Sequence, residues 1–184
     1  MVEFADLFRR YFVNTLFDST FVVLGILAAT TAEPDLGLEF ALGTMLAACL
    51  AIGISTGVSV YEAEHTEGEL RLQHLERAML SRLDNTRISR DLRISRISIA
   101  FVNFLAPLAV AGITSVPLVL FQVGVLPSFL VAAAVSSVTG IGIIFGAGFF
   151  LGKLTGRRPW LKAVRMSVVA ALTFGVLLAI ENLL

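Results

Sequence analysis

Five apolar segments, each long enough to cross a lipid bilayer, dominate the sequence. A hydrocarbon core about 30 Å thick requires about 20 predominantly apolar residues in helical conformation. Backbone groups inside lipid must be hydrogen-bonded within the protein, so such segments are expected to be helices and not open strands. The sequence therefore predicts an all-α polytopic membrane protein in one membrane domain, residues 1–184, with five transmembrane helices at approximately 11–31, 38–61, 97–121, 128–151 and 161–183.

The composition agrees with this assignment and excludes several functions. Of the 184 residues, 57% are hydrophobic and 15% are charged, whereas soluble domains carry roughly 25% charged residues. The net charge is zero, so we expect membrane lipid and not nucleic acid as a partner. Phosphate-binding glycine loops, nucleophile elbows, zinc-protease motifs and paired-cysteine motifs are not found. We therefore expect no enzymatic activity and no tightly bound cofactor.

The basic residues divide the connections into two classes. All fourteen Lys and Arg lie in the N-terminal segment, between the second and third spans, or around the start of the fifth span. In the opposite connections and at the C-terminal end, the only charged residues are acidic: Glu33, Asp35, Glu39 and Glu181. Because cytoplasmic loops are enriched in Lys and Arg, the sequence predicts a multi-pass protein of the cell membrane with a cytoplasmic N-terminus and an outer C-terminus.

Residues 62–96, between the second and third spans, form the largest predicted segment outside the membrane. We expect a short cytoplasmic helical insertion, whose first half continues the second span as a helix and turns at Asp84 and Asn85. The second half is typical of a helix at the level of the lipid headgroups, with a solvated connector into the third span as the alternative. Four arginines recur there every three residues: Arg87, Arg90, Arg93 and Arg96.

Asp18 is the most informative polar residue, because it lies well inside the first span. An ionisable group within a membrane costs several kcal/mol unless it is paired or faces water, so it indicates a functional site. As an alternative, Asp18 caps a helix that begins at Ser19, although residues 19–32 alone are short for a crossing. Asn14, one turn earlier, shares the face of Asp18 in either case.

The second span combines hydroxyl groups with small residues. Gly53 and Gly57 are four residues apart, a spacing that lets two helices approach closely. Ser55 and Thr56 lie between them and are candidates either for hydrogen bonds across a helix contact or for the wall of a substrate path. The fourth span repeats the small-residue pattern and predicts packing within the chain or between two copies, through Gly142, Gly146, Gly148 and Gly152.

Acidic residues follow at the start of the insertion. Glu62, Glu69 and Glu76 are spaced by seven residues, and His65 lies between the first two. On a helix, Glu62, His65 and Glu69 share one face. Carboxylates with one imidazole suit a divalent transition metal such as Fe²⁺, Mn²⁺ or Zn²⁺. A solvated charged surface is the alternative.

The layout of five spans with a charged helical insertion resembles the vacuolar iron transporter family. FDSTFVVLGILAATT is similar to the family's first span, and SVPLVLF is similar to a block of its third span. GAGFFLGKLTGRRPWLKAVRMSVVAALTFGV resembles the passage from the fourth span to the fifth. GISTGVSVYEAEHTEGE aligns without gaps to the family's second-span run and matches it at Ile54, Ser55, Tyr61 and Glu69.

The resemblance implies export of Fe²⁺ or Mn²⁺ from the cytosol, in exchange for protons, by a homodimer. Asp18 falls where the family keeps the aspartate of its translocation path. Thr56 stands where the family has a methionine, and Val60 stands in place of a glutamate. The expected metal path comprises Asp18, Ser55 and Thr56, and the expected metal-collecting residues are Glu62, His65, Glu69 and Glu76. A non-transporting membrane protein that keeps this fold for interaction or assembly is the alternative.

Overall fold

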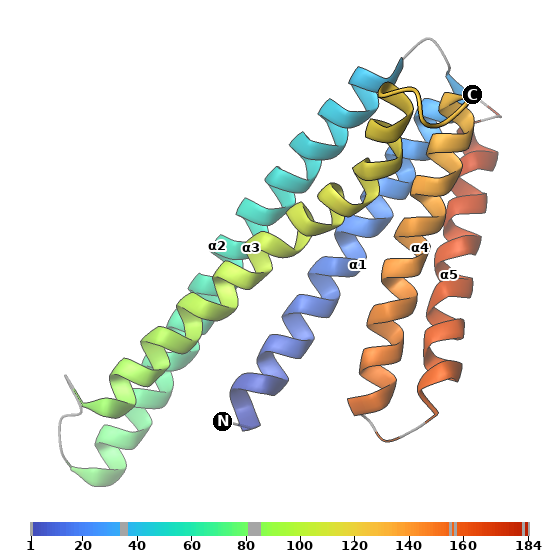
Figure 1. Cartoon of the computed structure of the whole chain (residues 1–184). Helices are drawn as coiled ribbons and strands as arrows, with labels where there is room; N and C mark the ends of the chain where they lie inside the picture. Colours follow the sequence, from blue (N-terminus) through green and yellow to red (C-terminus); the bar gives the residue numbers. More distant parts are fainter. Residues whose placement is uncertain are drawn as a thin grey trace.

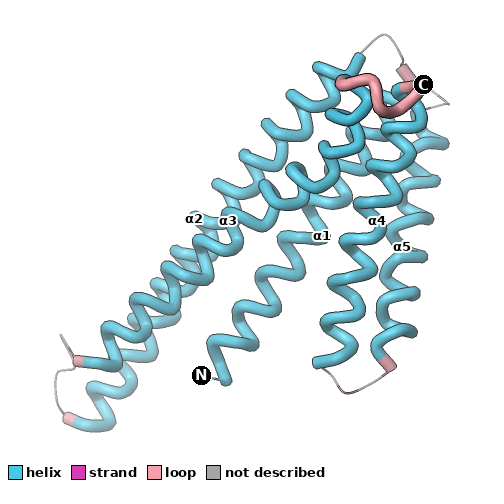
Figure 2. The backbone as a smooth tube through the Cα atoms, in the orientation of Figure 1, coloured by secondary structure: helices cyan, strands magenta, loops and turns pink. Residues whose placement is uncertain are grey.

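Every element of the described chain is a helix. The computed structural model describes residues 2–33, 37–80, 86–154, 156, 158–181 and 183, and Figure 2 shows helices and short loops over these ranges. All five helices are long and apolar enough to cross a membrane, which confirms the predicted all-α chain with five spans. The helices are α1 (Val2–Ala32), α2 (Gly37–Met79), α3 (Arg87–Gln122), α4 (Phe129–Leu154) and α5 (Pro159–Glu181).

Helix α1 is the central element of the bundle. It packs against each of the other four helices, while α2 packs mainly on α3, and α4 packs mainly on α5. Figure 1 shows the N-terminus at the same end as the α2–α3 and α4–α5 connections, with the C-terminus at the opposite end. Towards the N-terminal end, the α2–α3 pair diverges from the α4–α5 pair and extends beyond α1 (Figure 1).

The charged segment between the second and third spans is built from the two spanning helices themselves. Helix α2 continues without a break through Met79, as predicted for the first half of that segment. Residues 62–79 extend it by about 27 Å. Residues 87–96 form the first turns of α3, so they are continuous with the third span and do not form a separate helix. The predicted turn at Asp84 and Asn85 lies outside the described residues.

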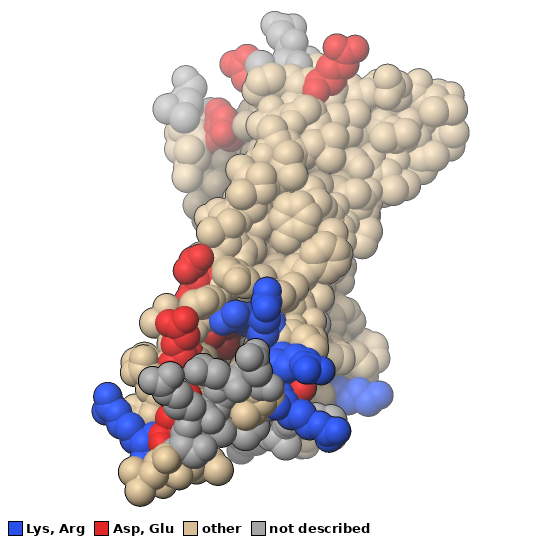
Figure 3. Space-filling model, turned by 90° about the vertical axis from the view of Figure 1, so that its left-hand side faces the viewer, with Lys and Arg blue, Asp and Glu red and all other residues tan. Residues whose placement is uncertain are grey.

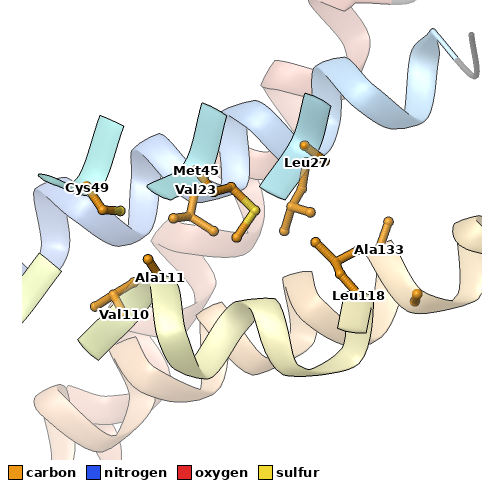
Figure 4. Close-up of a cluster of buried hydrophobic side chains, with 10 residues drawn as sticks. Val23, Leu27, Met45, Cys49, Val110, Ala111, Leu118 and Ala133 are labelled. Carbon is orange, nitrogen blue, oxygen red and sulfur yellow. The ribbon is translucent and has the colours of Figure 1, made fainter. Parts of the chain in front are cut away.

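The apolar core lies among α1, α2, α3 and α4. Helix association inside lipid depends on close van der Waals packing, because lipid tails are as apolar as the side chains. Cys49 is buried in this cluster, where it packs as a small apolar side chain, as its position in an apolar run predicts. Figure 4 shows side chains from the helices meeting in the cluster, which comprises Val23, Leu27, Ala41, Met45, Cys49, Val110, Ala111, Leu118, Ala132 and Ala133.

Small residues bring two helix pairs into close contact, as their spacing predicts. A Cβ atom added to Gly53 would lie 2.6 Å from the backbone oxygen of Phe104 in α3. A Cβ atom on Gly152 would lie 2.5 Å from Cα of Pro159 in α5. Only glycine fits at such backbone approaches. Gly142 and Gly146 differ, since an added Cβ atom would meet nothing within 4 Å in this chain.

Candidate functional site

Asp18 lies in the interior of α1, within the apolar span Arg9–Ala32. The alternative in which Asp18 caps a helix beginning at Ser19 is therefore wrong, because helical backbone continues on both sides of it. The Asp18 side chain is exposed, and its Oδ2 atom accepts a hydrogen bond of 3.2 Å from Nδ2 of Asn14. The structure thus presents a carboxylate and an amide side by side on the surface of a spanning helix.

The two faces of α1 differ sharply at this level. Asn14, Asp18 and Val22 follow one another at four-residue intervals and are exposed, whereas Thr15 and Ser19 are buried against the bundle. At membrane depth, an outward face meets lipid, a polar path or another protein. A charged group on such a face is costly unless polar atoms surround it, and within the described residues the side chains of Asn14 and Asp18 are both exposed.

A buried hydrogen bond on the inner face of α1 fixes α3 in place. Oγ1 of Thr15 donates to Oδ1 of Asn103 at 2.9 Å, and Nδ2 of Asn103 donates to the carbonyl oxygen of Ile99 at 2.9 Å. Asn103 is 0% exposed. Asn103 was not among the site residues expected from the sequence. An amide within an apolar span was the sequence signal for this contact, because a buried amide requires hydrogen-bond partners.

Thr56 is part of the same set of contacts, through α3. Pro107 has no N–H, so the carbonyl group of Asn103, four residues earlier, lacks its usual helical donor. Oγ1 of Thr56 lies 3.4 Å from that carbonyl oxygen and 2.8 Å from the carbonyl oxygen of Ile52. The close approach at Gly53 allows this reach between α2 and α3.

The predicted path residues are thus divided between different environments. Ser55 is exposed on α2, Thr56 is half-buried against α3, and Asp18 is exposed on α1. Within the described part of the chain, no hydrogen bond joins Asp18 to Ser55 or Thr56. Their assignment to one metal path remains a prediction.

The predicted metal-collecting residues lie on the charged part of α2. Nδ1 of His65 is 3.5 Å from Oε1 of Glu69, with side-chain exposures of 33% and 63%. Glu62 is exposed, and Glu76 is half-buried. Among the residues that the structure describes, no three His, Cys, Asp or Glu side chains form a group that could hold a metal ion. Metal collection by these four residues remains a prediction.

Charged side chains are concentrated at the two ends of the molecule. Figure 3 shows Lys and Arg beside Asp and Glu at the end that carries the α2–α3 connection, and Asp and Glu at the opposite end. The visible surface between the two ends is uncharged (Figure 3). An uncharged band between polar ends is the surface that a membrane-spanning bundle requires.

The geometry defines a five-helix bundle of membrane-spanning character, with Asp18 and Asn14 on an outward helix face. Comparison of the chain with protein-family models, with curated proteins and with solved structures finds no match.

Proposed function

We propose that this protein is a divalent-cation transporter, which exports Fe²⁺ or Mn²⁺ from the cytosol in exchange for protons. One observation carries the proposal: the carboxylate of Asp18 lies exposed on a membrane-spanning part of α1, beside the amide of Asn14. A carboxylate held in an apolar span typically marks the route of an ion or a proton. The resemblance of the sequence to vacuolar iron transporters supplies the class of cargo.

A single carboxylate can support the exchange of a metal ion for protons. An ionised carboxylate binds a dication, and a protonated carboxyl group does not, so proton binding and metal binding at Asp18 exclude each other. The oxygen atoms of Asp18 and Asn14 are hard ligands, which suit Mn²⁺ better than softer ions. We therefore expect Mn²⁺ to be carried at least as well as Zn²⁺.

A homodimer is part of the proposal. Asn14, Asp18 and Val22 are exposed on one face of α1 within the described part of the chain. A second copy packed on this face would keep the carboxylates away from lipid and provide a polar path between protomers. The exposed hydroxyl of Ser55 is a candidate for the wall of that path. Thr56 has a structural role in this proposal, because its hydroxyl bonds to carbonyl groups of α2 and α3.

A non-transporting assembly protein is the second candidate. It is favoured by the position of Thr56, whose hydroxyl takes part in a helix contact at the point where the resemblance places a metal ligand. In this case the exposed Asn14–Asp18 pair would form polar contacts with a partner helix and carry no cation.

Uptake into proteoliposomes tests the proposal. We expect the full-length protein to move Mn²⁺ or Fe²⁺ under a proton gradient, and Asp18→Asn to lower the initial rate by about tenfold or more, because a charged ligand is lost. Asp91→Asn is the matched control, since Asp91 is exposed on α3 before the apolar segment. Equal rates for wild type and Asp18→Asn would overturn the proposed path. Absence of uptake by folded wild-type protein would favour the assembly role.

A further inference from the structure

A cavity of about 480 Å³ lies between the charged part of α2 and the first turns of α3. The α3 side of the cavity contributes three guanidinium groups at three-residue intervals. The α2 side contributes two carboxylates and an imidazole. The residues that carry these groups are Arg90, Arg93, Arg96, Glu64, His65 and Glu69.

The charges around the cavity favour an anion. The three arginines exceed the two carboxylates by one positive charge, with the imidazole left out of the count. Glu69 has His65 as its neighbour at 3.5 Å. Over the part of the chain that the structure describes, Arg90 and Arg93 form no ion pair with either carboxylate. Guanidinium groups that line a cavity without a carboxylate partner are available to an external acceptor.

Arg96 is held beside the cavity by an aromatic ring. Its Nε atom is buried and has no hydrogen-bond partner within the described chain. Its guanidinium carbon lies 5.6 Å from the ring centre of Tyr61, so a cation–π contact holds the group in place. Arg96 also lines the cavity, so its guanidinium group adds to the positive charge that a ligand there would meet.

The N-terminal end of α3 also lies at the cavity. Thr86 is the N-cap of α3, and its hydroxyl oxygen accepts a hydrogen bond of 3.4 Å from the Ser89 N–H group. Both residues line the cavity. The N-terminal end of a helix has a partial positive charge, which favours an anion near it.

We propose that this cavity binds a phosphate group, carried either by a lipid headgroup or by a soluble phosphate. The planar guanidinium fork matches the oxygen atoms of a phosphate. A phosphodiester has one negative charge, which equals the excess charge of the cavity. Tyr61 and Arg96 lie where the apolar parts of α2 and α3 meet their charged parts, the level at which a bilayer places its phosphates.

Binding to the full-length protein in non-ionic detergent tests this site. Phosphatidylglycerol and inorganic phosphate are titrated separately at 0.15 M salt, and binding is followed by native mass spectrometry and thermal unfolding. We expect Arg93→Gln and Arg96→Gln each to weaken binding about tenfold, because a charge-assisted hydrogen bond is lost. Arg87→Gln is the matched control, since this exposed arginine of α3 does not line the cavity, and we expect a change of about twofold or less.

The two ligands distinguish the sources of the phosphate. Binding of phosphatidylglycerol alone assigns the site to a lipid headgroup, and binding of inorganic phosphate assigns it to a soluble ligand. If Arg96→Gln does not fold because its contact with Tyr61 is lost, Arg93→Gln still tests the site, since Arg93 is exposed. Binding of neither ligand, or equal binding by wild type, Arg93→Gln and Arg87→Gln, would overturn the proposal.

Discussion

Asn103 links α3 to two other helices, one through its side chain and one through its backbone carbonyl group. Its side-chain amide bonds to Thr15 of α1, and its backbone carbonyl accepts from Thr56 of α2. Pro107 is the cause of the second contact, because it leaves that carbonyl without a helical donor. A proline that weakens α3 locally therefore creates an attachment point for α2.

We predict an energetic coupling between Thr15 and Asn103. Thr15→Val and Asn103→Ala should each lower the free energy of unfolding in bicelles, and the double variant should lose less than the sum. The expected coupling is about 0.6 kcal/mol, the average for hydrogen bonds between membrane helices. Thr139→Val is the control, because the Thr139 hydroxyl bonds to Val135 of its own helix. Strict additivity of Thr15→Val and Asn103→Ala would contradict the prediction.

The sequence predicted that Asp18 lies inside a helix but could not describe the environments of its proposed partners. The continuous α1 confirms the helix, and the depth of Asp18 in a membrane stays a prediction from span length. The setting of Thr56 depends on a proline in another helix, about fifty residues away along the chain. No local pattern around Thr56 contains that information. The sequence therefore predicted Thr56 as a polar candidate but did not predict its contact with the Asn103 carbonyl group.

Glycine spacing acts at the scale of helix pairs. Gly53 lets the backbone of α2 reach that of α3, and Gly152 does the same for α4 and α5. A pattern of small residues predicts that such contacts exist, and both exist within one chain. It cannot predict which helix is the partner, because the pattern is the same for an internal contact and for a contact between two copies.

We predict that Gly53→Ala separates α2 from α3. The added Cβ atom would lie 2.6 Å from the Phe104 backbone oxygen, and a backbone group cannot move away as a side chain does. Such overpacking costs about 1–3 kcal/mol, measurable as a lower free energy of unfolding. Gly43→Ala is the matched control in α2, because its Cβ atom would meet nothing within 4 Å. Equal stability of the two variants would show that the contact is absent.

The sequence predicted how far α2 extends beyond the membrane. It did not predict how residues 87–96 are arranged, because their arginine spacing fits two different helix orientations. Continuation of α2 beyond Tyr61 follows from its helix-forming residues. The arginines of residues 87–96 have a spacing that fits both a helix along the membrane surface and a helix entering the membrane. In the structure these residues are the first turns of α3 and are continuous with its apolar part. The choice depends on packing against α2, which the α3 sequence does not encode by itself.

At the scale of the molecule, the basic residues of the described chain lie towards one end. The N-terminus and the α2–α3 and α4–α5 connections share that end (Figure 1), so the uneven loop charges of the sequence become an uneven charge along the bundle. The order of the helices around α1 was not predictable, because each span is apolar on most of its surface. The number of spans was predictable from length and hydropathy.

We predict that the basic end faces the cytoplasm. In a Cys49→Ser background, Val123→Cys should react with a membrane-impermeant maleimide on intact cells. Leu80→Cys and Arg158→Cys should react only after the membrane is opened. All three positions are exposed, and Val123 lies at the opposite end from the other two. Labelling of Leu80→Cys and Arg158→Cys on intact cells, with Val123→Cys protected, would reverse the predicted orientation.

Helix α2 forms one unbroken rod from Gly37 to Met79. Its outer tip is about 39 Å from Gly53, the point where it touches the α3 backbone. Because α3 packs along α2, a sideways force on the tip would act on both helices and reach the contact at Gly53 as a bending torque. A partner that binds the tip of α2 would therefore exert force on helix contacts inside the bundle.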